Sequence, residues 1–429
     1  MYQVSNLIKY NRVAYIGGIS SNAGSLVRGN YYSTTTNNTS TSSINKKARQ
    51  SHHHHVNSKS ITDYLGKALT SNEKFNIKQV MLSSLHSVYQ GREHLERGNF
   101  AQGEKLILNG FKTLNNDVDF SSSLFAVPTH ALGLASIRKG DFKSGTTLFN
   151  LAIDRCKNVE NIVYKNYILP EALNDLGLSL VRQKKSEDAY EALQNAEKLT
   201  SNEDITQLSS SILTNFGEYY KNRKEYAQAS FYHGKAHYQL INKREDNNID
   251  LVRCLANRAQ VLRLDGDIKS GRLLLSEAIS ALRKLENKAE KYGKKPRHLD
   301  WAKILVECGH FHYAENAYDK ARNTLKNAKD IFDVMEISNS PDAVINALNL
   351  AIIEKKFPIE ASSEEFVKTQ VQAVEPHYQK LTEQSFFVGT GTSNLIKNLL
   401  DKKLTSKSPE VINMGLISPL HFPLSRLSG

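Results

Sequence analysis

The sequence predicts an all-α fold built from a helical unit that repeats along the chain. The main observation behind this prediction is a set of small residues that recurs at fixed spacing. Composition agrees with it, because 429 residues with 40% hydrophobic and 23% charged side chains can build a large core. No stretch approaches the roughly 18 consecutive apolar residues of a membrane-spanning helix. Three cysteines without a CxxC pair argue against a disulfide framework or a structural zinc site.

Six segments carry the repeating pattern. Each has a small residue, a second one 12 positions later and a third 7 positions beyond that. The six triplets are Gly91/Gly103/Gly110, Gly133/Gly145/Ala152, Gly177/Ala189/Ala196, Gly217/Ala229/Ala236, Ala259/Gly271/Ala278 and Gly309/Ala321/Ala328. In five segments an aromatic or aliphatic residue lies three positions before the second member: Phe100, Phe142, Tyr226, Ile268 and Tyr318. The third segment has Ser186 there instead.

This pattern resembles the tetratricopeptide repeat (TPR), a family whose two helices need small residues where they cross closely. Leu176-Gly177-Leu178, Phe216-Gly217-Glu218 and Cys308-Gly309-His310 match the family's Leu-Gly position, the first of them fully. Phe142 and Tyr226 fall at its aromatic position. The repeats begin 42, 44, 40, 42 and 50 residues apart, which resembles the long repeats of kinesin light chains rather than the common period of about 34 residues. The resemblance implies a TPR solenoid, a right-handed αα-superhelix of about six antiparallel helix pairs. Its first helices are expected to line a concave groove.

Helices are also predicted on both sides of the repeats, which cover roughly residues 80–357. Residues 62–82 are expected to add a helix in front. Behind the repeats, the segment 342–356 follows Pro341 and ends before Phe357-Pro358. Its apolar residues suit a capping helix that covers the last repeat.

The C-terminal region is predicted to hold one or two further helices within residues 359–404. From Ser406 onward the tail contains Pro409, Pro419 and Pro423 and is expected to be extended. The sequence leaves open whether this tail folds back into the groove. The predicted domains are a transit segment (1–32), a disordered linker (33–61), the solenoid with its capping helices (62–357) and the C-terminal helices with the tail (358–429).

The N-terminal segment is basic. Residues 1–62 contain seven Lys and Arg residues and no acid, so the net charge of +12 falls to +5 over the rest of the chain. An acid-free, Ser-rich and weakly amphipathic start is typical of a mitochondrial transit peptide, with Arg28 a few residues before a cleavage point. The alternative is a plain disordered tail. The run His52–His55 lies in low-complexity sequence and is not assigned a metal.

No motif argues for catalysis. Gly140–Thr146 and Gly266–Arg272 have two glycines separated by four residues, but neither continues with the Lys-Ser/Thr of a phosphate-binding loop. Cys156, Cys254 and Cys308 are predicted to be core thiols. We therefore predict a protein that is not an enzyme and has no cofactor, metal or small-molecule substrate.

The resemblance to the TPR family places a set of side chains in the groove. The predicted partner-binding residues are Arg92, His130, Arg138, Asn174, Arg182, Asn215, Lys221, Arg253, Asn257, Arg263, Lys303 and Tyr313. Acids at equivalent positions are fewer, namely Glu96, Glu171 and Glu218, so the groove favours a protein partner with an acidic or extended segment. A groove asparagine can hydrogen-bond a peptide backbone whatever its sequence. Nucleic acid is disfavoured because the body of the chain is nearly neutral. Within the basic stretch 284–297, the loop Lys291–Arg297 is interpreted as solvated.

These observations predict a non-catalytic scaffold that binds another protein. Its outline, a transit segment followed by a short repeat array, resembles mitochondrial TPR proteins that support respiratory complexes. The expected location is therefore the mitochondrial matrix or inner membrane surface, with a role in assembly or maintenance of a respiratory complex. The alternative is a cytoplasmic adaptor like kinesin light chain, which loses weight because residues 1–80 lack sustained heptads.

Overall fold

The computed structural model describes residues 71–115, 123–157, 167–200, 206–242, 249–291, 298–359, 363–383, 394–420 and 422–424. The chain divides into two compact units, and all of these residues lie in the second, Lys59–Gly429. That unit is described by itself. The predicted transit segment, the linker and the residues 62–70 of the predicted front helix lie outside the described residues.

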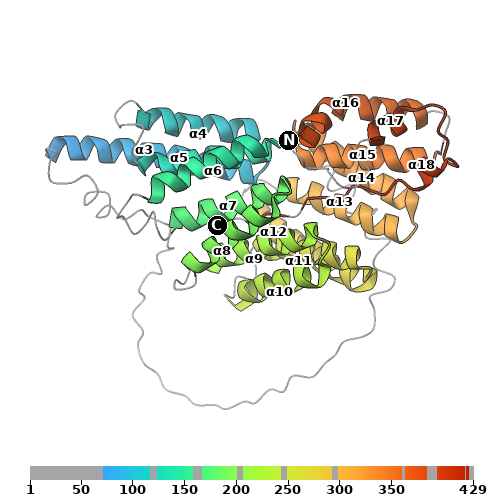
Figure 1. Ribbon diagram of the computed structural model, residues 1–429, viewed down its shortest axis with the longest axis horizontal. Coiled ribbons are helices and arrows are strands. Elements are labelled where there is room, and N and C mark those ends of the chain that lie inside the picture. The colour runs from blue at the N-terminus through green and yellow to red at the C-terminus, as the bar shows by residue number, and fades with distance from the viewer. Residues whose placement is uncertain are drawn as a thin grey trace, which may run out of the picture. The chain divides into compact units, whose positions relative to one another are not determined.

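Seven helix pairs follow one another along this unit (Figure 1). They are α3 (Ser71–Glu96) with α4 (Phe100–Asn115), α5 (Ala126–Arg138) with α6 (Phe142–Lys157), α7 (Leu169–Arg182) with α8 (Ser186–Thr200), α9 (Thr206–Asn222) with α10 (Tyr226–Asn242), α11 (Ile249–Asp265) with α12 (Ile268–Lys291), α13 (His298–Ala314) with α14 (Tyr318–Val334), and α15 (Pro341–Lys356) with α16 (Ser363–Glu383). A 3₁₀ turn, η1 (Ser123–Phe125), precedes α5, and the short helices α17 (Leu395–Leu400) and α18 (Pro409–Ile412) follow α16. The predicted all-α solenoid is confirmed.

The recurring small residues lie where the two helices of a pair touch. A Cβ added to Gly91 would lie 2.6 Å from the carbonyl oxygen of Gly103, and one added to Gly177 would lie 2.7 Å from the side chain of Leu193. No larger side chain fits at that spacing without moving the helices apart. The close crossing of the two helices in each pair therefore explains the spacing of small residues in the sequence.

The turn inside each of the first six pairs contains a residue in the left-handed region, seven positions after the first small residue. The six are Gly98 (φ 83°), Gly140 (79°), Lys184 (58°), Lys224 (62°), Gly266 (96°) and Asn316 (58°). A left-handed residue lets the chain reverse tightly between the helices while the last helical carbonyls remain hydrogen-bonded. Lys184, for example, donates its backbone N–H to the carbonyl of Val181 at 3.1 Å. Two of the six positions are lysines, although a left-handed conformation favours glycine.

The ends of the array differ from a simple six-repeat solenoid. Residues 71–82 do not form a separate helix but begin α3, the first helix of the first pair. The predicted capping helix is α15, which begins at Pro341 after the N-cap Ser340. It pairs with α16 and is buried along most of its length, so it forms a seventh pair as well as covering the sixth.

The first pairs contact the last ones within the unit. A carboxylate oxygen of Glu96, at the end of α3, lies 2.8 Å from the guanidinium of Arg253 in α11. A Cβ on Gly98 would meet Met335 and Leu299, and one on Gly140 would meet Leu381 and Pro341. The superhelix therefore closes on itself, and the side chains on its concave side are enclosed.

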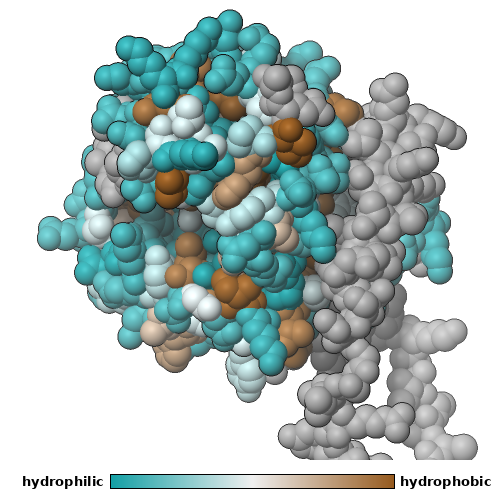
Figure 2. Space-filling model, turned by 90° about the vertical axis from the view of Figure 1, so that its right-hand side faces the viewer, coloured by the Kyte–Doolittle hydropathy of each residue, from teal (hydrophilic) through white to brown (hydrophobic). Residues whose placement is uncertain are grey.

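The outer surface seen at the end of the array formed by the later helices is mostly hydrophilic, with hydrophobic residues in separate small groups (Figure 2). In the part of the chain that the structure describes, no helix has the length and apolar character needed to span a membrane.

Candidate protein-binding groove

The groove is the concave side of the superhelix, lined by the first helix of each pair. Nine of the twelve residues predicted to line it are buried, and the other three, Arg138, Arg263 and Tyr313, are half-buried. The groove is therefore an enclosed channel rather than an open surface. The segment that occupies this channel therefore determines which part of it is free to bind a partner.

The C-terminal tail of the same chain lies in this channel. The backbone N–H of Phe422 donates to Oδ1 of Asn257 at 2.7 Å, and Nδ2 of Asn257 donates to the carbonyl of Phe422 at 2.9 Å. Asn349 holds Ile417 in the same way, at 2.7 Å and 2.9 Å. One side-chain amide thus satisfies both backbone groups of one tail residue, a contact that does not depend on the side chain that residue carries.

Three more side chains bind tail carbonyls. Gln260 donates to Pro419 at 2.9 Å, Arg253 donates to Pro423 at 3.1 Å, and Lys356 donates to Met414 at 2.8 Å. Along α11 the contacts run from Gln260 through Asn257 to Arg253 as the tail advances from Pro419 to Pro423. The tail therefore runs antiparallel to the helix that holds it, in an extended conformation.

Apolar side chains anchor the tail at both ends. Phe422 and Leu424 are 3% and 4% exposed, and Leu424 joins a cluster with Leu213 and Leu240. The ammonium of Lys303 lies 5.0 Å from the centre of the Phe422 ring. Nearer α15, Met414 packs into the core formed by α15, α16 and α17. Affinity for the tail thus combines backbone hydrogen bonds with a few buried apolar anchors.

A buried histidine orients one of the two gripping asparagines. Nε2 of His310 lies 3.0 Å from Nδ2 of Asn349, whose Oδ1 already accepts from Ile417, so the histidine nitrogen accepts and the ring is neutral. Burial, together with the charge of Arg263, holds the pKa of His310 well below its usual value. The neutral ring fixes the amide in the orientation that serves the tail.

The predicted groove cations are paired with carboxylates of the groove. The ion pairs are Arg92–Glu171 at 2.5 Å, Arg138–Glu96 at 3.7 Å, Arg182–Glu218 at 2.5 Å, Lys221–Glu218 at 2.6 Å, Arg253–Asp300 at 2.9 Å, Arg263–Glu307 at 2.6 Å and Lys303–Asp342 at 3.2 Å. Sequence reasoning named only Glu96, Glu171 and Glu218 as groove acids. It missed Asp300, Glu307 and Asp342. Each lies in the first helix of the next pair, and only the stacking of the pairs brings it close to its cation.

Burial and the neighbouring carboxylates shift the pKa values of three of these cations. Desolvation lowers the pKa of Lys221 and of Lys303, against the carboxylates of Glu218 and Asp342, which raise it. At Arg253 burial also acts to lower the pKa, but Asp300, Glu96 and Asp250 outweigh it and raise the pKa overall. At all three cations the neighbouring carboxylates therefore oppose the effect of burial on the pKa.

The remaining predicted residues have other roles. Asn257 binds the tail as expected of a groove asparagine, but Asn174 and Asn215 bind each other, with Nδ2 of Asn215 at 2.9 Å from Oδ1 of Asn174. His130 lies 2.7 Å from Asp175, and Tyr313 accepts from Lys356 at 2.7 Å. Sequence reasoning missed Asn349. The signal was present, because Asn349 stands two residues before Ala351, as Asn257 stands two before Ala259.

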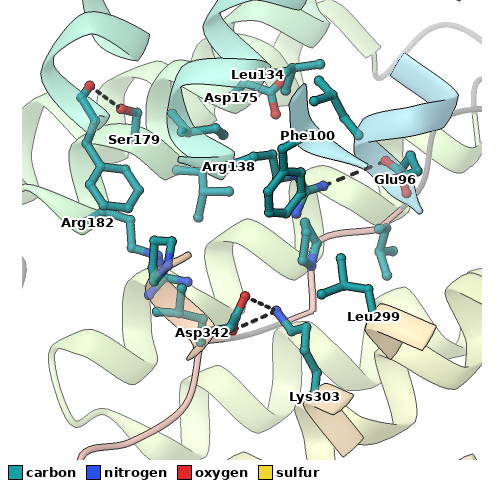
Figure 3. A pocket seen from close by; sticks show the side chains of 18 of the residues that line it. Glu96, Phe100, Leu134, Arg138, Asp175, Ser179, Arg182, Leu299, Lys303 and Asp342 are labelled. Atoms are coloured by element: carbon teal, nitrogen blue, oxygen red, sulfur yellow. Dashed lines mark hydrogen bonds and ion pairs between the residues drawn. The ribbon is translucent and has the colours of Figure 1, made fainter. Parts of the chain in front are cut away.

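Where the first pairs meet the last, the tail closes a small cavity of about 80 Å³ (Figure 3). Arg138 points toward Glu96 on one side of it and Lys303 points toward Asp342 on another. Leu420, Pro423 and Leu424 of the tail complete the lining. Little free space remains here, so this part of the channel is filled.

A larger space of about 810 Å³ remains open on the other side of the tail. It lies between tail residues 413–420 and the turns that join α7 to α8 and α9 to α10. Its lining includes five cations and two carboxylates: Arg182, Lys184, Lys221, Arg223 and Lys224, with Glu218 and Glu410. This is the part of the groove that the tail leaves accessible.

The remaining candidate sites from the sequence are the histidine run, the cysteines and the basic loop. Among the described residues no group of three or more His, Cys, Asp or Glu side chains could hold a metal ion. The three cysteines are buried, as predicted for core thiols, and burial raises the pKa of Cys156 and of Cys254 to about 12. The run His52–His55 and the loop 292–297 lie outside the described residues.

Comparison with known proteins identifies the class by structure alone. No protein-family model matches the chain, and no curated protein matches it in sequence. Among solved structures it is similar to a Rap protein complexed with competence and sporulation factor, with a TM-score of 0.53, 14% identity, and coverage of 77% of this chain and 84% of the other. It is also similar to the Rap conjugation gene regulator of the plasmid pLS20 in complex with the Phr* peptide, with a TM-score of 0.53, 15% identity, and coverage of 76% and 80%. The fold is a helical-repeat solenoid of the TPR type.

Proposed function

We propose that this protein is a non-catalytic scaffold that binds an extended segment of a partner protein in its concave groove, where its own tail now lies. The observation that carries the proposal is the pair of asparagine grips, Asn257 on Phe422 and Asn349 on Ile417. Each grip reads only backbone atoms, so a segment of different sequence can take the same place. The two similar Rap structures were each solved as complexes, one of them with a peptide, which supports a groove of this kind.

The partner competes with the tail or binds beside it. A tail that is part of the same chain is present at an effective concentration in the millimolar range, so a competing segment must bind tightly or displace it stepwise. The tail from Val411 to Leu424 carries no Asp, Glu, Lys or Arg. The groove therefore accepts an uncharged segment along α11 and α15, while the open space beside the tail offers cations.

Photo-crosslinking tests this proposal in the full chain. A photoreactive phenylalanine analogue replaces Tyr226, which lines the open part of the groove, or Tyr238, which is 68% exposed elsewhere on the same helix α10. We expect a defined partner protein to be captured from Tyr226 and not from Tyr238. Equal capture from both positions, or capture from Tyr238 alone, would place the partner on the outer surface and overturn the groove assignment.

The proposal includes a mitochondrial location. It is supported by the acid-free segment 1–62 and by the outline shared with TPR proteins that support respiratory complexes, so the proposed role is assembly or maintenance of such a complex. The test is the N-terminal sequence of the mature protein from its own cells. A start between about residues 30 and 60 supports import. A start at Met1 or Tyr2 would contradict it and favour the cytoplasmic adaptor.

A further inference from the structure

We infer that the open space beside the tail is an anion-binding site for an acidic extended peptide, and that Lys184 and Lys224 are the residues that select it. This inference rests on the proposed function, since it names the chemistry of the partner segment. Three observations support it independently of one another: the charge of the lining, the backbone conformation of the two lysines and the unused edge of the tail.

The lining has an excess of positive charge that the protein does not neutralise itself. Glu218 is held between Arg182 at 2.5 Å and Lys221 at 2.6 Å, so its charge is already matched. Arg223 pairs with Glu225 at 2.6 Å. Lys184 and Lys224 have no carboxylate within ion-pair distance among the described residues. Their two ammonium groups, set against the single carboxylate of Glu410, are the charges of the lining available to a ligand.

Both lysines occupy a backbone position that a lysine disfavours. Their φ angles are 58° and 62°, in the left-handed region, where the first, second and fifth pairs have glycine. A residue with a Cβ is disfavoured relative to glycine in that conformation, because its Cβ crowds the following carbonyl oxygen. Two of the six turns carry lysine there, and both of those turns line the same open space. Strain kept at two neighbouring positions points to a use for the side chains.

The tail itself offers an edge to an extended ligand. Asn349, Gln260 and Asn257 hold backbone groups of Ile417, Pro419 and Phe422, in that order. Gly415 and Leu416, which precede Ile417, and Ser418, which follows it, make no backbone hydrogen bond within the described part of the chain, and all three line the open space. An extended peptide can pair with such an edge as an added strand. A peptide with acidic side chains would meet both this edge and the lysines.

The test uses the full chain and three labelled probes: a dodecapeptide of alternating Glu and Val, its counterpart with Gln in place of Glu, and a 12-nucleotide poly-U RNA. Fluorescence anisotropy measures binding to the wild type, to the Lys184→Gly/Lys224→Gly double variant and to two controls. Asn316→Gly makes the same backbone change in the sixth pair, away from the site. Lys185→Ala removes a neighbouring lysine that does not line the space.

We expect the acidic peptide to bind the wild type and both controls, more weakly as salt rises. The double variant should lose about tenfold in affinity, because each exposed ion pair contributes up to about fivefold. Its melting temperature should stay equal or rise by about 1–2 °C, since glycine relieves the strain, so lost binding would not reflect lost folding.

Three outcomes would overturn the inference: equal binding of the acidic peptide to the wild type and the double variant, equal binding of the Glu and Gln peptides, or preferential binding of the RNA. The crosslink from Tyr226 separates this failure from failure of the groove itself. If the double variant still captures the partner from Tyr226, the groove function stands and the lysines have no part in it.

Discussion

At the scale of single residues, the core position sixteen residues after the first small residue of each repeat shows one exception. It is filled by Ile107, Phe149, Leu193, Leu275 and Leu325 in five repeats and by His233 in the fourth. The imidazole packs on Gly217, where an added Cβ would lie 2.6 Å from the ring. Neither ring nitrogen of this histidine has a hydrogen-bond partner among the described residues.

Burial lowers the pKa of His233 to about 3, with Lys221 and Arg258 acting in the same direction and Glu218 opposing them. Because the pKa is lower in the folded than in the unfolded chain, the unfolded state binds the proton first as the pH falls. Stability is therefore full above about pH 6.5 and falls below it, by up to about 1.4 kcal/mol per pH unit, until the folded histidine also titrates near pH 3.

Replacing this histidine tests that account. His233→Leu restores the apolar type found at the five equivalent positions and removes a buried polar group without partners. We expect a higher free energy of unfolding at pH 7, and a shallower loss of stability between pH 6.5 and 5, measured by urea denaturation at each pH. His310 and His312 still contribute to the slope of the variant, because burial lowers the pKa of both. An unchanged slope would contradict the assignment.

At the scale of elements, the tail is held by hydrogen bonds from α11 and α15 to its backbone and by its own buried apolar side chains. Its apolar anchors, Phe422 and Leu424, are the parts that a variant can remove without touching the groove. Since the tail is tethered, it outcompetes a free peptide of the same sequence as long as the anchors remain. Weakening the anchors should therefore open the groove to a segment supplied in trans.

The corresponding prediction concerns a labelled peptide of residues 413–424. We expect the wild-type chain to bind it weakly and the Phe422→Ala/Leu424→Ala variant to bind it at least about tenfold more tightly, as measured by fluorescence anisotropy. Adding Asn257→Ala and Asn349→Ala to that variant should abolish the gain. The matched control is Asn215→Ala, because Asn215 bonds to Asn174 and not to the tail. Peptide binding that survives the loss of both gripping asparagines would refute the backbone-recognition account.

At the scale of the whole unit, one arginine connects three distant parts of the chain. Arg253 contacts Glu96 of the first pair, Asp300 of the sixth and the carbonyl of Pro423 in the tail. Its side chain is 4% exposed, so its removal would take the ion-pair partner away from the buried carboxylate of Asp300. Closure of the superhelix and retention of the tail thus depend on a shared group.

Arg253→Leu should therefore lower the free energy of unfolding by about 3–5 kcal/mol, which urea denaturation at pH 7 measures. Small-angle scattering should show a larger radius of gyration as the first and last pairs separate. Arg97→Leu is the control, because its pair with Glu93 is exposed and is worth about 0–1 kcal/mol. Equal effects of the two substitutions would show that the buried network does not hold the superhelix closed.

The sequence by itself determined the repeating architecture. A small residue is required wherever two helices cross within one pair, and that requirement acts over 12 and 7 positions along the chain, so it is legible in the sequence. The capping role of α15 was also predictable, because Pro341 and Phe357-Pro358 mark both of its ends. Asn257 was assigned to the groove from the repeat pattern, because it lies two residues before the small residue Ala259.

Only the tertiary structure decided what the groove contains. The acids that neutralise Arg253, Arg263 and Lys303 lie 39 to 47 residues further on, at distances set by how the pairs stack. The contacts between Asn257 and Phe422 span 165 residues, and those between Asn349 and Ile417 span 68. Such contacts depend on the superhelix closing around its own C-terminus, and backbone recognition leaves no side-chain pattern in the tail. That is why the occupant of the groove was visible only once the chain was folded.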